Sequence, residues 1–146
     1  MLRSRRHMVK KLNPFGLGVI CALSLLLGAG CYLFRYEAVM ETHLTLMEQY
    51  STKLQYMADN GLQVSGPDWV EFEYPGQRAV EFVRIVRPSF GDTESLAAFE
   101  RSLELYLLLV ASPEILRGSD PVSIVTAGRS NLLEAIRVNR EVLTRA

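Results

Sequence analysis

The chain has 146 residues, of which 49% are hydrophobic and 22% charged, a length that allows one small domain with its own core. Its 16 basic residues balance its 16 acidic residues, and every acidic residue follows Arg35. Residues 36–146 are therefore net acidic, which excludes a nucleic-acid-binding protein that acts through a basic surface.

A basic tail and a long uncharged stretch begin the chain. The tail, residues 1–14, holds five Lys or Arg residues, and no charge occurs over residues 12–34. At about 1.5 Å per residue, a helix over residues 15–34 would span roughly 30 Å, the thickness of bilayer hydrocarbon. We therefore predict a transmembrane helix over residues 15–35, with the lipid bilayer as one of its partners.

The orientation of this helix follows from the basic residues beside it. Lys and Arg near a first span tend to stay cytoplasmic, and the amino-terminal flank holds most of them. We predict a single-pass protein of the bacterial inner membrane, with its amino terminus cytoplasmic and its carboxy-terminal domain periplasmic. A cleaved signal peptide is one alternative. A lipoprotein signal is another, because residues 27–31 resemble a loose lipobox with lipidation at Cys31.

Small side chains recur along the predicted span. Cys21, Ser24, Gly28 and Cys31 follow one another at spacings of three, four and three, which places them on one helical face. Such a face lets membrane helices approach closely, so we expect a helix–helix contact there, unless the small residues are only scattered. Both cysteines lie in this stretch, so the remaining domain has no disulfide.

A stalk helix is predicted over residues 36–60, which contain neither Gly nor Pro. Apolar residues recur there at spacings of three and four, as in the seam of a coiled coil. A single helix packed on its own domain is the alternative. Asn60 and Gly61 suit a left-handed helix end. The predicted stalk interface consists of Met40, Met47, Tyr50, Leu54 and Met57.

The fold class predicted for residues 61–146 is α+β, a small extracytoplasmic domain with a β-hairpin and two carboxy-terminal helices. Residues 69–74 alternate between apolar and polar, and residues 80–86 are rich in β-branched side chains. Pro75, Gly76 and Gln77 between them predict a turn. A short helix over residues 79–86 is the alternative.

Two helices are predicted after the hairpin. Asp92 is the expected N-cap of the first, which is apolar all round over residues 105–111. That run is predicted to be core, with an exposed contact surface as the alternative. Asp120 caps the second, with Pro121 in its first position. Arg129 and Asn139 interrupt its apolar stripe. Either they lie at the solvent-exposed edge of the stripe, or they set the register of helix packing or contact a partner.

The sequence offers few residues for catalysis. It contains two histidines, His7 and His43, and no cysteine beyond Cys31, so no Cys/His metal site or Ser/His/Asp triad is predicted. His43 near Glu41 and Glu48 is the nearest approach to a metal-binding group. We therefore predict no catalytic residue, cofactor or metal, and a binding or scaffolding role by elimination.

Part of the chain resembles a known family. Residues 101–109 form an arginine-bearing apolar segment that ends near Ser112, and Gly128, Leu132 and Asn139 follow. In this pattern residues 95–143 resemble the flagellar basal-body-associated FliL family, which is stator-associated and has a stomatin-like periplasmic domain. The resemblance implies a non-enzymatic protein that forms rings around, or docks on, the flagellar motor stator.

The function predicted from the sequence is that of an inner-membrane accessory or scaffold protein. Its periplasmic domain would self-associate, as a homo- or hetero-oligomer, or dock on other subunits of a larger membrane complex. One alternative is a subunit of a secretion or pilus assembly platform. Another is a lipoprotein assembly factor acylated at Cys31.

Overall fold

The computed structural model describes the backbone of residues 14–90 and 93–145, and the side chains of residues 36–90 and 93–145. Every element in this part is helical. The α+β prediction is therefore wrong, because the described residues contain no strand. The elements are α1 (Pro14–Asp59), the 3₁₀ helix η1 (Pro67–Trp69), α2 (Val70–Phe90), α3 (Glu94–Leu109), the 3₁₀ helix η2 (Pro113–Leu116) and α4 (Pro121–Arg145).

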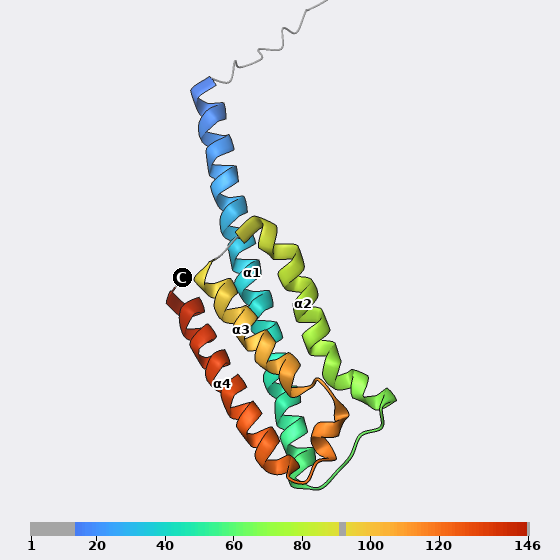
Figure 1. Cartoon of the computed structure of the whole chain (residues 1–146). Helices are drawn as coiled ribbons and strands as arrows, with labels where there is room; N and C mark the ends of the chain where they lie inside the picture. The colour runs from blue at the N-terminus through green and yellow to red at the C-terminus, as the bar shows by residue number, and fades with distance from the viewer. Residues whose placement is uncertain (1–13, 91–92, 146) are drawn as a thin grey trace, which may run out of the picture. The chain divides into compact units, whose positions relative to one another are not determined.

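The chain divides into two compact units, residues 1–36 and residues 37–146. The second unit is a four-helix bundle made of residues 37–59 of α1 together with α2, α3 and α4 (Figure 1). Successive helices run in opposite directions along the bundle, as expected where the connections between them are short. The predicted stalk helix therefore supplies one wall of the same bundle as the residues after it.

The predicted β-hairpin is instead the single helix α2. Apart from Pro75, its buried residues are Phe72, Gly76, Ala79, Val83 and Val86, which follow one another at spacings of four, three, four and three. That period belongs to one face of a helix, whereas a strand would bury every second residue. Of the β-branched residues that favoured a strand, Val83 and Val86 lie on the buried face of this helix, whereas Val80 and Ile85 are exposed. The alternative of a helix over residues 79–86 was nearer, but too short.

The Pro75-Gly76 pair, which predicted a turn, lies inside α2. A Cβ atom on Gly76 would come within 2.7 Å of Leu107 Cδ2 and 3.4 Å of Tyr106 Cδ1, so the missing side chain allows α3 to lie close. Glu71 pairs with Lys53 of α1, and Arg84 pairs with Glu81 one helical turn away. Both charged residues therefore pair with partners on helices and not across a hairpin.

The predicted membrane span is also corrected. Within the residues that were described, no helix is both long and apolar enough to cross a membrane. The side chains of α1 are described from Tyr36 onward, and in that part Glu37, Glu41, Glu48 and Lys53 interrupt the apolar pattern. By this finding the transmembrane, single-pass prediction is wrong, and with it the inner-membrane location and the periplasmic domain.

Several sequence predictions concern residues that the structure does not describe. The small-residue face and the lipidation site belong to residues 14–35, where only the backbone is described, and Asp92 falls in the gap between α2 and α3. The N-cap of α3 in the structure is Thr93, whose hydroxyl accepts from the Leu96 amide at 3.3 Å. The predicted small-residue face consists of Cys21, Ser24, Gly28 and Cys31, and Cys31 alone is the predicted lipidation site; both predictions therefore lie outside the described side chains.

Two helix boundaries are confirmed. Gly61 adopts the left-handed conformation, with φ of 62°, two residues after α1 ends at Asp59. Asp120 Oδ1 accepts from the Ser123 amide at 3.1 Å, and Pro121 is the first residue of α4. Hydrogen bonding from the Ser123 side chain, and then from its amide, lowers the pKa of the Asp120 carboxyl. Both boundaries depend on local backbone chemistry, which is why the sequence predicted them.

Aromatic side chains join the beginning of α2 to the end of α3. The rings of Trp69 and Phe72 stack with centroids 4.9 Å apart. Trp69 Nε1 donates to the Val110 carbonyl at 2.9 Å, and the Tyr106 hydroxyl donates to the Phe72 carbonyl at 2.6 Å. These bonds satisfy polar atoms that would otherwise be buried without partners, so they help to hold α2 against α3.

Candidate functional site

The predicted stalk interface lies mostly inside the bundle. Met40, Met47 and Leu54 are fully buried, while Tyr50 and Met57 are half-buried. The Tyr50 ring meets Phe72 of α2 edge-on, with centroids 6.0 Å apart. This burial fits the alternative of a helix packed on its own domain, and contact with a partner through this seam stays a prediction.

The seam between α1 and α4 is polar. Arg140 Nε donates to Glu41 Oε1 at 2.9 Å, and its Nη1 donates to Glu48 Oε2 at the same distance. Farther along, Arg129 Nη2 donates to Thr52 Oγ1 at 3.0 Å. Arg140 is therefore paired with two carboxylates of α1, whereas the buried Nε of Arg129 has no hydrogen-bond partner among the described residues.

His43 is not brought together with Glu41 and Glu48. Its ring lies 5.2 Å from the Phe82 ring and 6.1 Å from the Phe99 ring, on the side of α1 that faces α2 and α3. Burial, together with the positive charge of Arg78, lowers the pKa of His43. In the part of the chain that is described, no three His, Cys, Asp or Glu residues are grouped to hold a metal ion.

The two polar residues in the stripe of α4 have different positions. Asn139 is fully buried, and neither its amide nitrogen nor its oxygen has a hydrogen-bond partner among the described residues. Arg129 is half-buried and reaches Thr52. The solvent-edge interpretation is therefore wrong for Asn139, which points into the core.

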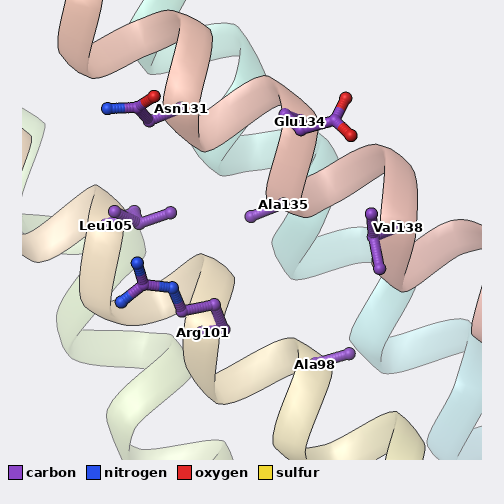
Figure 2. Close-up of a pocket in the computed structure, with 7 residues that line it drawn as sticks. All are labelled: Ala98, Arg101, Leu105, Asn131, Glu134, Ala135 and Val138. Carbon is purple, nitrogen blue, oxygen red and sulfur yellow. The ribbon is translucent and has the colours of Figure 1, made fainter.

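A groove separates the outer sides of α3 and α4 (Figure 2). Its volume is about 420 Å³, and it is open to solvent. The small side chains Ala98 and Ala135 form the hollow, with Leu105 and Val138 beside them. Three polar residues complete the lining at its edges: Arg101, Asn131 and Glu134.

Apolar surface extends beyond the groove on both helices. Of the apolar run over residues 105–111, Tyr106, Leu109 and Val110 are buried as predicted, whereas Leu108 is 66% exposed. Ile124 on α4 is 52% exposed. Because the bundle covers only one side of α3, the other side of this run faces solvent.

An exposed contact surface over residues 105–111 was one of two alternatives predicted from the sequence, whereas the groove was not predicted. The α4 side of the groove is formed by Ala135 and Val138. Neither belongs to the apolar stripe predicted for this helix, which consists of Val122, Val125, Leu132, Ile136 and Leu143. One feature of the sequence could have indicated the groove: two small residues, Ala97 and Ala98, lie near the start of α3, and a large one, Leu108, lies near its end. Their meaning becomes clear only when α4 is placed beside α3.

Comparison with known proteins gives no relative of this chain: no family model matches it, and searches of curated proteins and solved structures find no similar protein. The resemblance to the FliL family stays a prediction.

Proposed function

We propose that the protein is a non-enzymatic assembly module that holds protein subunits together through the outer sides of α3 and α4. The observation that carries this proposal is the open apolar groove lined by Ala98, Leu105, Ala135 and Val138. Exposed apolar surface next to a groove is typical of a site that another molecule covers.

The shape and composition of the groove favour a protein rather than a small ligand. Pockets for small molecules enclose most of the ligand surface, whereas this groove is open to solvent. Its apolar centre has Arg101 and Glu134 at the edges, and interfaces between proteins commonly combine an apolar centre with a polar rim. A helix is the element whose width and apolar stripe suit a groove between two helices.

Site-specific photo-crosslinking of the full-length chain in its native cells tests this proposal. A photoreactive residue at position 138 should give a discrete protein adduct, because Val138 lines the groove and is 40% exposed. The control is position 85, since Ile85 is 61% exposed but lies on α2, away from the groove. Adding Leu108→Glu should remove the adduct at position 138. Absence of any adduct at position 138 would contradict the proposal.

Docking on a larger complex is a further prediction of the same kind. The flagellar motor stator implied by the family resemblance, and a secretion or pilus assembly platform, would each appear as a different adduct at position 138. Mass spectrometry of the adduct identifies which protein it contains.

A further inference from the structure

We infer that the outer side of α3, at the edge of the groove, is covered by a second copy of this chain, whose α3 lies antiparallel to the first across a two-fold axis between Arg101 and Glu104. This inference rests on the proposed function, since it names the partner of the same surface. It is carried by the order of exposed residues along α3.

The outer stripe of α3 consists of Ala97, Arg101, Glu104 and Leu108, all of which are exposed. Their spacings of four, three and four place them on one face of the helix. Ala97 stands four residues before Arg101, and Leu108 stands four residues after Glu104. Reversing the direction of the stripe therefore exchanges Arg with Glu and the small residue with the large one.

An antiparallel second copy would match this stripe with itself. With the axis between Arg101 and Glu104, each arginine lies opposite the glutamate of the other copy. Each Leu108 lies opposite Ala97 of the other copy. A closed two-fold dimer uses the same patch on both chains, so a self-complementary stripe of this kind is what such a dimer requires.

The charged pair at the centre of the stripe is accessible to a partner. Arg101 Nη1 lies 2.8 Å from Glu104 Oε2, and the two side chains are 60% and 61% exposed. Two such pairs brought together form a square of alternating charges, in which each arginine contacts both glutamates. Complementary charges across an interface fix the register of the partners.

The groove gives the leucine of the other copy a place to bind. Ala98 and Ala135 form a hollow between the two helices (Figure 2). Ala98 directly follows Ala97 in α3, so the partner's leucine opposite Ala97 lies at the edge of this hollow. Leu108, exposed by 66% in a single chain, would lose this exposure in the dimer. A large side chain entering a hollow between smaller ones is the packing used where helices associate.

A charge-exchange experiment on the full-length chain tests the inference. Arg101→Glu alone gives four negative groups at the axis, and Glu104→Arg alone gives four positive ones. Each variant should self-associate about tenfold or more weakly than the unaltered chain, because like charges across an interface are strongly unfavourable. Mixed together, the two variants should bind each other, since every contact across the axis then joins a glutamate to an arginine.

The readout is co-purification of the two variants carrying different affinity tags, with molar mass measured by light scattering. Association restored in the mixture, and in the double variant Arg101→Glu/Glu104→Arg, is the expected result. Ile85→Glu is the matched control, and it should leave association unchanged because Ile85 lies on α2. Circular dichroism checks that each variant keeps its helical content.

Three results would overturn the inference: a monomeric unaltered chain, single variants that associate normally, or a mixture that does not associate. The photo-crosslink at position 138 separates this inference from the proposed function. An adduct that contains only a different protein refutes the second copy as occupant and leaves the assembly role in place. No adduct at all contradicts both.

Discussion

Helix α4 meets its two neighbours through opposite kinds of surface. Toward α1 it presents Arg140, which bonds to Glu41 and Glu48 at 2.9 Å. Toward α3 it presents Ala135, which faces Ala98 across a groove of about 420 Å³. The first side pairs Arg140 with carboxylates of the same chain, whereas the second leaves apolar surface in solvent.

This difference distinguishes the contacts that stabilise the bundle from the surface that is free to bind another molecule. The α1–α4 seam contributes to the stability of the folded chain, and its removal should be seen in unfolding experiments. The α3–α4 groove adds little to that stability, since its side chains are incompletely covered. Its removal should be seen in association experiments. The predictions below test this division, beginning with the interior of α4.

The largest expected effect comes from Asn139, which lies on the core side of α4. Asn139→Leu should raise the free energy of unfolding by about 1–3 kcal/mol, because a buried amide without partners is replaced by an apolar side chain of similar size. Asn139→Asp should lower it, because a charge is then buried. Urea denaturation at neutral pH measures both. Destabilisation by leucine would show that the amide is satisfied.

Arg140 tests the charged side of α4. Arg140→Met should lower the free energy of unfolding by about 1 kcal/mol, since two half-buried ion pairs are lost and the aliphatic part of the side chain is retained. The effect should shrink at high salt. Arg137→Met is the control, because Arg137 pairs with residues of its own helix in solvent. If both variants lowered the free energy of unfolding by the same amount, the ion pairs of the α1–α4 seam would contribute no more to stability than those on the surface.

His43 adds a dependence on pH to the closed part of the bundle. Its folded-state pKa lies below the ordinary value of 6.5 because of burial and Arg78. The unfolded chain therefore binds the proton more readily, so stability should fall as the pH drops below about 6.5 and be fully present above it. Urea midpoints between pH 5 and pH 8 should follow this slope. His43→Leu should reduce the slope, and an unchanged slope would refute the contribution of His43.

The smallest effect on stability is expected on the open side. Leu108→Glu should change the free energy of unfolding by no more than about 0.5 kcal/mol, because Leu108 is 66% exposed. The same change should abolish self-association. Ile85→Glu should alter neither quantity. A large loss of stability in Leu108→Glu would mean that the outer side of α3 belongs to the closed bundle.

The sequence predicted features whose cause is local. Asp120 and Gly61 were correctly identified as helix boundaries, because capping and the left-handed conformation depend on a few neighbouring residues. The Pro75-Gly76 pair was misinterpreted as a turn for the opposite reason. Gly76 is explained by Leu107, which comes thirty-one residues later and reaches it only in the folded bundle.

The groove was predictable only in part. The apolar run over residues 105–111 was recognised, but which of its residues are exposed depends on where α1, α2 and α4 pack against α3. Leu108 therefore could not be distinguished from Leu109 by composition, although one is 66% exposed and the other is 4% exposed. The buried position of Asn139 likewise follows from packing rather than from the sequence pattern.

Sedimentation velocity of an equimolar mixture of the Arg101→Glu and Glu104→Arg chains tests most directly whether the open side of α3 joins two copies. The account predicts a dimer in the mixture and monomers when either variant is measured alone at the same concentration. Monomers in the mixture, or dimers in both separate samples, would contradict it.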